Sequence, residues 1–288
     1  MRWKPGGRSE DLEDVRGEGT GSGFRVRGPH LGIGGFLVLL VLSLVFKRDF
    51  FSLLGVANVA SPPAATTMSQ PMARGPEDER QVQFVSFVLD DVQKTWAQAF
   101  SRANRPYPHA KLVLFSDVTR SGCGFAEGAS GPFYCPEDHK VYIDLAFYEE
   151  LKTRFGAPGE FAQAYVIAHE VGHHVQNLLG IDTKVRQMQA REPSQANELS
   201  VRLELQADCL AGVWGYSTEE RNILEQGDVE SGLAAAAAVG DDRLQRQTGG
   251  RVNPERWTHG SSEQRVAWFR RGLSAGRINA CDTFASRD

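Results

Sequence analysis

The clearest pattern of apolar and polar positions lies at about residues 160–179. Branched apolar residues recur there at the spacing of one helix face: Val166, Ile167, Val171 and Val175. Gly180 follows, and glycine commonly ends a helix. His169 and His173 are four residues apart in this run, so they project from the same side of the helix. The pattern predicts a buried helix that presents two imidazoles together.

Similar patterns predict further elements in the part of the chain after residue 77. One helix face is expected from the recurrence of Val85, Val88, Val92, Trp96 and Ala99, which predicts a helix at about 81–103. Further helices are expected at about 145–155, 182–191, 194–216, 218–225 and 228–246, and a last one after Ser261 or Ser262. Short apolar runs predict strands at 111–115, 133–135 and 141–145. The expected class is α+β, mostly helical with a small β-sheet.

Residues 31–46 form an apolar run without a charged side chain. As a helix the run would span ~24 Å at ~1.5 Å per residue, against a ~30 Å hydrocarbon core. Lys47 and Arg48 follow it, and long basic side chains can reach back to the membrane surface. A cleaved signal peptide would need a clean small-residue cleavage site, and a core helix would normally have a polar face. The run therefore predicts a transmembrane helix at 31–48.

The remaining composition divides the chain into further segments. Residues 1–30 are rich in glycine and charged residues and poor in large apolar ones, which predicts a disordered N-terminal tail. Residues 49–76 are rich in proline, alanine and threonine and predict a linker, so the globular domain is expected at 77–288. The formal net charge of −4 lacks the basic footprint of a nucleic-acid-binding protein.

The four cysteines favour a location outside the cytosol. Cys123 and Cys135 flank a glycine-rich segment that a disulfide could close, and Cys209 and Cys281 would then form a second bridge. Four cysteines allow three pairings, and four buried free thiols are the alternative. Disulfides persist mainly in oxidising compartments. Basic residues flank the apolar run on both sides, so they orient it only slightly.

The two histidines belong to an H-E-x-x-H motif that predicts a Zn²⁺ site. Glu170 lies one step round the helix, where its carboxylate can reach a metal-bound water without being a ligand. Glu204 and Asp208 lie on one face of the helix expected at 194–216, so Glu204 can complete a His₂Glu set and Asp208 can fix the tautomer of a histidine. A helix with two satisfied histidines and a solvated acidic face is the simpler alternative.

Three further residues have open roles. Glu198 is a competing third ligand, although no acid follows it four residues later. His259 lies just before the last helix and is a candidate donor to the oxyanion of a tetrahedral intermediate, with Tyr165 or Tyr216 as substitutes. His174 lies about 100° round the helix from His173 and is not expected to be a ligand.

Several motifs together resemble the bacterial neutral zinc metallopeptidases that carry a single N-terminal membrane segment. They are HEVGHH, ELQADCLAG, WTHGSSEQRV, MRWK, SGCG, GPFYCPEDHKVYIDL and GDDRLQ, and they extend over nearly the whole chain. The resemblance implies a zincin-like, gluzincin-like fold and peptidase activity, with His169, His173 and Glu204 as zinc ligands and Glu170 as catalytic base. It also implies a single-pass protein of the bacterial inner membrane.

The sequence thus predicts a membrane-anchored zinc metallopeptidase that hydrolyses peptide bonds, with its catalytic domain on the periplasmic side. Its expected partners are a peptide or protein substrate and the lipid bilayer, without nucleic acid. An edge strand beside the zinc site could pair with an extended substrate, and 141–145 is the candidate strand. The alternatives are a membrane-tethered interaction module with structural or vestigial zinc, and a zinc amidase that acts on cell-wall peptides.

Overall fold

The computed structural model describes residues 1–17, 75–128, 131–247 and 252–285. The predicted transmembrane helix at 31–48 and nearly all of the predicted linker lie outside these ranges. Among the residues within them, no helix has both the length and the apolar character needed to cross a membrane. The described residues form one compact unit.

The main sheet is small and mixed, and its order is β1-β2-β6-β5. Strand β2 (Lys111–Phe115) pairs in parallel with β1 (Leu12–Asp14) on one side and with β6 (Lys140–Asp144) on the other. Strand β5 (Phe133–Cys135) pairs antiparallel with β6, so β5 and not β6 is the free edge at this end of the described sheet. The prediction that residues 141–145 form the edge strand was therefore wrong, because β6 has neighbours on both sides.

A two-stranded hairpin lies beside the main sheet. It consists of β3 (Val118–Ser121) and β4 (Gly124–Glu127) and occupies part of the segment that was expected to be a glycine-rich loop. The disulfide between Cys123 and Cys135 links this hairpin to β5. The second disulfide joins Cys209 to Cys281, so both of the expected pairings are confirmed.

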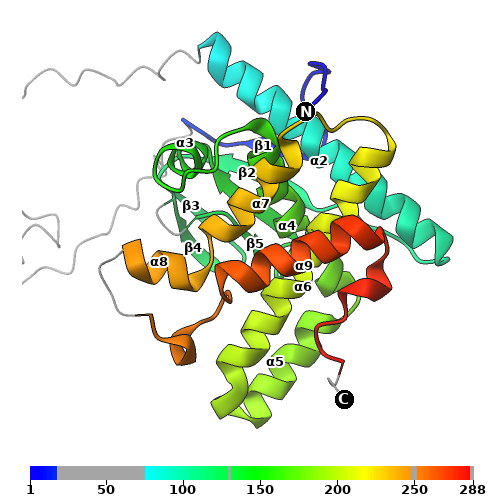
Figure 1. Ribbon diagram of the computed structural model, residues 1–288. Coiled ribbons are helices and arrows are strands. Elements are labelled where there is room, and N and C mark those ends of the chain that lie inside the picture. The colour runs from blue at the N-terminus through cyan, green and yellow to red at the C-terminus, as the bar shows by residue number, and fades with distance from the viewer. Residues whose placement is uncertain (18–74, 129–130, 248–251, 286–288) are drawn as a thin grey trace, which may run out of the picture. The chain divides into compact units, whose positions relative to one another are not determined.

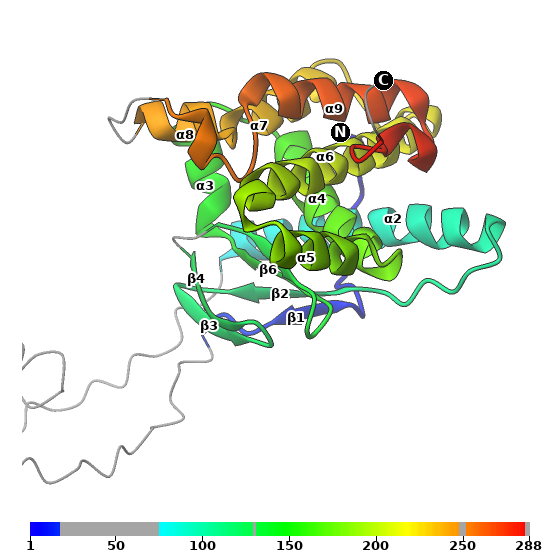
Figure 2. The same cartoon turned by 90° about the horizontal axis from the view of Figure 1, so that it is seen from below.

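Helices make up most of the domain and stack on one side of the sheet. Their bounds are α2 Pro76–Arg102, α3 Ala146–Thr153, α4 Glu160–Leu178, α5 Ile181–Arg191, α6 Ala196–Glu220, α7 Asp228–Ala238, α8 Asp241–Gln247 and α9 Ser262–Ala275, with short 3₁₀ turns at Pro193–Gln195, Pro254–Arg256 and Ile278–Cys281. Figures 1 and 2 show the sheet on one side of the domain, α4 and α6 in its middle and α9 on the far side. The mostly helical α+β class is confirmed.

The core fills the space around α4, and the predicted apolar stripes supply much of it. Four residues of the α2 stripe are fully buried: Val85, Val88, Val92 and Trp96. The Phe161 and Trp214 rings stack between α4 and α6 at 5.6 Å. Gly180 adopts a left-handed φ of 70° directly after α4, as its sequence position predicted. This packing fixes α4 as a rigid support for its histidines.

Two predicted helices differ in the structure. No separate helix forms at 218–225. Residues 218–220 are the end of α6, where Thr218 is buried with its hydroxyl bonded to the Gly215 carbonyl, 2.6 Å away, and residues 221–225 are not helical. The helix expected at 228–246 is broken between α7 and α8. At the break, a Cβ on Gly240 would lie 2.4 Å from the Ser262 nitrogen, so the chain turns there against the start of α9.

Helices α6 and α9 pack unusually closely through glycine. A Cβ on Gly272 would lie 1.9 Å from the Cys209 carbonyl oxygen, and one on Gly212 would lie 2.1 Å from the Phe269 carbonyl oxygen. Of the two serines expected as a cap, Ser261 caps α9, and it forms a capping box with Gln264. The close approach places the second half of α9 directly against the middle of α6.

The first 17 residues are part of the folded domain. Leu12, Glu13 and Asp14 form β1, and Met1 is buried against the helical core. The prediction of a disordered tail is thus wrong for residues 1–17, while residues 18–30 lie outside the described ranges. Sequence patterns missed this segment because β1 holds a single apolar residue, Leu12, and its other contacts are ion pairs.

Candidate metal centre

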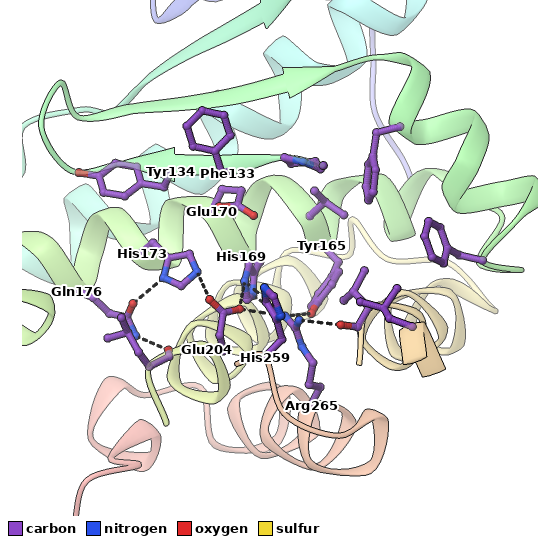
Figure 3. Close-up of a pocket in the computed structure, with 18 of the residues that line it drawn as sticks. Phe133, Tyr134, Tyr165, His169, Glu170, His173, Gln176, Glu204, His259 and Arg265 are labelled. Carbon is purple, nitrogen blue, oxygen red and sulfur yellow. Dashed lines mark hydrogen bonds and ion pairs between the residues drawn. The ribbon is translucent and has the colours of Figure 1, made fainter. Parts of the chain in front are cut away.

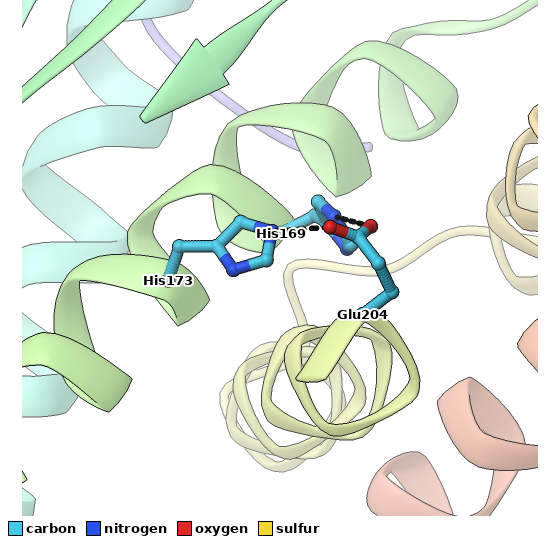
Figure 4. Close-up of side chains that lie close together, drawn as sticks. All are labelled: His169, His173 and Glu204. Atoms are coloured by element: carbon cyan, nitrogen blue, oxygen red, sulfur yellow. Dashed lines mark ion pairs between the residues drawn. The ribbon is translucent and has the colours of Figure 1, made fainter. Parts of the chain in front are cut away.

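Three side chains from two helices converge at one point. His169 and His173 come from successive turns of α4, and Glu204 reaches them from α6 (Figure 4). The Nε2 atoms of His169 and His173 each lie 3.3 Å from one of the two oxygens of the Glu204 carboxylate. The ligand atoms of the three residues all lie within 4.8 Å of one another. They are the only such His, Cys, Asp and Glu cluster among the residues that the structure describes.

Small residues let the two helices approach closely enough for this convergence. A Cβ on Gly172 would lie 3.1 Å from the backbone oxygen of Ala207, so the backbones of α4 and α6 nearly touch beside the cluster. Gly172 is the second of the two spacer residues of the motif, and a larger side chain there would separate the helices. The spacing of the motif therefore serves the packing as well as the chemistry.

Each histidine is oriented through its other ring nitrogen. The Nδ1 of His169 lies 2.9 Å from a carboxylate oxygen of Asp208, and the Nδ1 of His173 lies 2.8 Å from the amide oxygen of Gln176. Both partners accept a hydrogen bond, so both Nδ1 atoms carry hydrogen and both Nε2 atoms face Glu204. This is the tautomer that a metal ligand needs.

A chain of amides supports the orientation of His173. The Gln176 amide nitrogen donates to the carbonyl oxygen of Leu203 at 2.7 Å and to the amide oxygen of Gln206 at 3.1 Å. Gln206 in turn donates to the carbonyl oxygen of Cys281 at 2.9 Å. Since Cys281 is bonded to Cys209 on α6, this chain ends on a covalent link.

A buried charge network supports the orientation of His169. The Asp208 carboxylate is fully buried and accepts two hydrogen bonds from the Arg265 guanidinium, at 2.8 and 2.9 Å, as well as one from the Tyr165 hydroxyl. Arg265 comes from α9, where it is itself buried. A buried carboxylate is unfavourable unless it is paired, and the guanidinium supplies that pairing.

The electrostatics of the cluster are those of a cation site. Burial would raise the pKa of the Glu204 carboxyl, but the charges and hydrogen bonds of His173 and His169 hold it well below its usual range. Burial would likewise lower the pKa of His169, yet the Asp208 carboxylate outweighs it and raises that pKa to about 10. The two carboxylates therefore favour positive charge at the two rings, which a bound metal ion would supply.

The residues present fit a divalent metal ion. Two imidazole nitrogens and one carboxylate form the donor set of a catalytic zinc site, which leaves further coordination positions to water or substrate. Both Nδ1 atoms are already occupied and both Nε2 atoms face the same carboxylate. Among the described residues no fourth His, Cys, Asp or Glu closes the cluster, as a structural zinc site usually requires.

The cluster opens onto a pocket of about 630 Å³. Glu170, on the same helix α4 as the two histidines, lines this pocket. Its side chain lies beside His169 and points toward Phe133 (Figure 3). Phe133 and Tyr134 of β5 form part of another wall. The pocket therefore brings together the cluster, a buried carboxylate that is not a ligand and the edge strand of the sheet.

His259 also lines the pocket and is held by an aspartate. Its Nδ1 lies 3.2 Å from one oxygen of Asp241, while the other oxygen of Asp241 accepts from the backbone nitrogens of Thr258, His259 and Gly260. The hydrogen bond to Asp241 raises the pKa of His259 above its usual value. The imidazole is half exposed, so its second nitrogen is available to a bound molecule.

Other candidates from the sequence have different places. Glu198 pairs with Arg202 on the outer surface of α6, 2.7 Å away, and is not part of the cluster. His174 is not part of the cluster either: it donates to the Pro108 carbonyl and accepts from Tyr134, and burial lowers its pKa to about 4. It is therefore a neutral structural histidine.

Sequence reasoning missed three site residues: Gln176, Arg265 and Asp241. Gln176 lies three residues after His173, a helical spacing that could have indicated a partner for its ring. Arg265 is an arginine at an inward-facing position of α9, four residues before the buried Phe269. Asp241 was missed because the prediction of one continuous helix at 228–246 placed it on the surface of that helix.

The comparisons with known proteins agree with this site. The family model described as "Putative neutral zinc metallopeptidase" matches residues 1–284. The chain is 45% identical over 289 residues to the "Uncharacterized protein YpfJ" of Escherichia coli (strain K12), which covers 99% of both chains. It is 46% identical over 210 residues to the "Uncharacterized protein Rv2575" of Mycobacterium tuberculosis (strain ATCC 25618 / H37Rv), which covers 69% of both. No solved structure matches the chain.

The family match begins at the first residue, and it therefore includes the N-terminal strand as well as the cluster of His169, His173 and Glu204. A match of this length covers both helices that form the cluster and the helix that supplies Arg265. The chain belongs to the neutral zinc metallopeptidase family.

Proposed function

We propose that this protein is a zinc metallopeptidase that hydrolyses peptide bonds. The observation that carries the proposal is the geometry of His169, His173 and Glu204. Their ligand atoms converge while the remaining ring nitrogens are already bonded, and Glu170 faces the same pocket without joining the cluster. A ligand set that is open on one side, with a carboxylate beside it, is typical of a hydrolytic zinc site.

The roles of the residues follow from their positions. A zinc ion held by the three ligands would polarise a scissile carbonyl and make water a stronger acid. Glu170 takes the proton of the attacking water and returns it to the leaving amine. His259 holds its Nδ1 hydrogen on Asp241 and offers an Nε2 hydrogen to the developing oxyanion. Asp208 and Gln176 keep the two ligand rings in place.

The edge strand β5 is the proposed position of the substrate backbone. Phe133 and Tyr134 line the pocket, and β5 has no second neighbour in the described sheet. An extended peptide can therefore add to this edge through main-chain hydrogen bonds, which do not depend on its side chains. The substrate class that this arrangement favours is an unfolded or extended segment of a protein.

The proposed location is outside the cytosol. Two disulfides, one of them buried in the core, support an oxidising compartment. The apolar run at 31–46 supports attachment to the bacterial inner membrane. Both features are properties of the chain itself and are independent of the peptidase reaction.

The experiment is metal analysis and peptide cleavage with the purified full-length chain in detergent. Wild type is expected to bind one zinc ion and to cleave an unfolded protein such as reduced casein. Glu170→Gln is expected to keep its zinc but to lose at least ~100-fold in rate, because general base catalysis contributes ~10²–10⁴-fold. Glu263→Gln, which alters an exposed carboxylate on α9, serves as the control and keeps full activity.

Three outcomes separate the alternatives. A chain that binds zinc but cleaves neither proteins nor cell-wall peptides would support an interaction module. Cleavage of purified wall material without any cleavage of proteins would support an amidase. A chain that retains no zinc after purification and reloading would remove the basis of the proposal, and His169→Ala provides the reference for that state.

A further inference from the structure

The N-terminal segment, residues 1–17, and the domain that begins at residue 75 share one sheet. β1 pairs in parallel with β2, in the register Leu12 to Leu112. The Leu112 nitrogen donates to the Asp11 carbonyl at 2.8 Å, and the Val15 nitrogen donates to the Leu114 carbonyl at 2.9 Å. Figure 2 shows β1 lying alongside β2 at the side of the sheet away from α9. The segment thus supplies an outer strand of the described sheet.

Side chains of β1 and its preceding residue extend the contact across the sheet. Asp11 accepts from Lys111 at 2.8 Å and lies 2.7 Å from the Nδ1 of His109. Glu13 pairs with Lys140 of β6 at 2.6 Å. Lys111 and His109 outweigh the burial of Asp11 and lower the pKa of its carboxyl, as expected for a charge paired in the folded state.

The residues before β1 contact the helical side of the domain. The Trp3 indole donates to Glu160, at the start of α4, at 3.0 Å, and its ring packs against Phe84 of α2 at 5.3 Å. The backbone nitrogen of Arg2 donates to the Ile223 carbonyl at 2.7 Å. Residues 1–17 therefore contact four separate parts of the domain: the sheet, α2, the start of α4 and the turn after α6.

This arrangement constrains how the chain meets a membrane. A chain that crosses a bilayer once has the residues before and after the crossing in opposite compartments. The predicted crossing at 31–48 lies between the N-terminal segment and the domain in the sequence. Strands on opposite sides of a bilayer cannot hydrogen-bond to each other, so a single crossing would remove every contact described above.

We infer that residues 1–17 lie in the same compartment as the metal centre, outside the cytosol, and that the chain between residues 17 and 75 crosses the bilayer an even number of times, zero included. Within that stretch, the apolar run at 31–46 is the part of the chain whose composition favours the lipid bilayer as a partner. The compartment follows from the two disulfides of the domain, because the N-terminal segment must accompany them. The inference holds whatever reaction the site catalyses.

The first experiment locates both parts of the chain in cells. All four cysteines of the protein are in disulfides, so a single added cysteine is the only free thiol. Lys4→Cys and Arg270→Cys each place it at an exposed position, one in the N-terminal segment and one on α9. Right-side-out spheroplasts are treated with a membrane-impermeant maleimide before or after lysis.

Both variants are expected to be labelled without lysis. Labelling of position 270 in intact spheroplasts while position 4 needs lysis, or the reverse, would establish an odd number of crossings and overturn the inference. Labelling of both positions only after lysis would overturn the assignment to the outside, although the two parts would still share a compartment. Neither result depends on peptidase activity.

The second experiment tests the contact between β1 and β2 directly. Asp11→Cys and Lys111→Cys replace an ion pair with two thiols, and a protease site is inserted near residue 66 of the full-length chain. Free thiols are trapped, the chain is cleaved, and the fragments are separated on a denaturing gel. The two fragments of the double variant are expected to migrate as one species without reductant and as two species with it. Each single variant is the control and should separate into two in both cases. Complete separation of the double variant would exclude the shared sheet.

Discussion

His169 and His173 are held by partners of different charge, so the orientation of each ring depends on a different kind of contact. Asp208 is a carboxylate whose charge is balanced by Arg265, so its bond to His169 belongs to a buried ionic network. Gln176 is neutral, and its bond to His173 depends on the correct orientation of one amide. An amide holds its orientation best where both of its ends are bonded: the Gln176 nitrogen donates to Leu203 and Gln206, and its oxygen accepts from His173.

Gln176→Leu is therefore expected to weaken zinc affinity by about 10–100-fold, the usual effect of losing a partner that orients a metal ligand. Competition with a chelating dye measures this affinity. Gln176→Glu keeps an acceptor for the His173 ring and should recover most of it. Gln189→Leu on α5 removes a glutamine that donates to the Ala196 carbonyl and the Ser200 hydroxyl of α6, and it is the matched control. Equal affinities for wild type and Gln176→Leu would contradict the assignment.

Asp241 is expected to set the alkaline limit of activity through His259. The hydrogen bond to Asp241 raises the pKa of His259, and only the protonated ring has both an Nδ1 hydrogen for Asp241 and an Nε2 hydrogen for the substrate. Activity should therefore fall as pH rises through the pKa of His259. Asp241→Asn removes the charge that favours the protonated ring, so the alkaline limb should move to lower pH.

The measurement is kcat/KM against pH for a chromogenic peptide, whose limbs report groups of the free enzyme. Asp242→Asn, a change in the neighbouring carboxylate that bonds Ser262, is the control and should leave the limb in place. A limb that stays unchanged in Asp241→Asn, with activity retained, would show that His259 does not titrate in the reaction.

At the scale of elements, α9 is what completes the site. It brings Arg265 to Asp208, and it can do so because Gly272 and Gly212 allow its backbone to lie against α6. Short-range patterns predicted that a helix begins near Ser261, since the capping box is a local signal. They did not predict its inner face. The apolar residues of this segment favour an inner face of Val266, Trp268 and Phe269, but only Phe269 of these three is buried, together with Arg265 and Leu273.

Gly272→Ala is expected to separate α9 from α6 and to lower the free energy of unfolding by about 1–3 kcal/mol, the usual cost of overpacking. The added Cβ would meet the Cys209 carbonyl at 1.9 Å, and backbone atoms cannot move aside as a flexible side chain can. Denaturant unfolding measures the change. Ser274→Ala, on the exposed face of the same helix, should change stability by no more than ~0.5 kcal/mol. Similar values for both variants would mean that the contact relaxes easily.

The difference between local signals and contacts with distant residues explains which elements could be predicted. The metal helix, the α2 stripe and the strands β2 and β6 follow from periodicities within a few turns of chain. The ends of α7 and the edge position of β5 depend on residues far away, such as Ser262 and the pairing of β6. The metal ligands themselves were predictable, because spacing along a helix fixes which side chains face the same way.

At the scale of the whole molecule, the two disulfides are expected to differ in how much they contribute to stability and to zinc affinity. Cys209–Cys281 spans 72 residues and Cys123–Cys135 spans 12, so loss of the first is expected to cost about 4 kcal/mol of stability and loss of the second about 3. Only the first supports the amide chain to His173, through the Cys281 carbonyl. Paired Cys→Ser variants should both melt earlier, but only the Cys209/Cys281 pair should also bind zinc more weakly. Equal zinc affinity in the two pairs would argue against that support.

The composition predicted a domain that starts near residue 77, and it could not predict that the chain's first residues belong to it. Short polar strands carry no periodic signal, and their partners here lie about a hundred residues away, as with Asp11 and Lys111. Long-range pairing of this kind is visible only in the fold. The domain boundary drawn from composition therefore cuts through a sheet.

This discontinuous domain bears on how soluble protein should be prepared. A truncation that starts at residue 75 would remove the apolar run, but it would also strip β2 of its neighbour, expose Phe84 and leave Glu160 without its indole donor. An uncovered strand edge invites association between molecules. Joining Gly17 to Gly75 through a short flexible spacer would delete the apolar run and keep the strand. Poor behaviour of the simple truncation would then reflect a missing piece of the fold rather than an unstable enzyme.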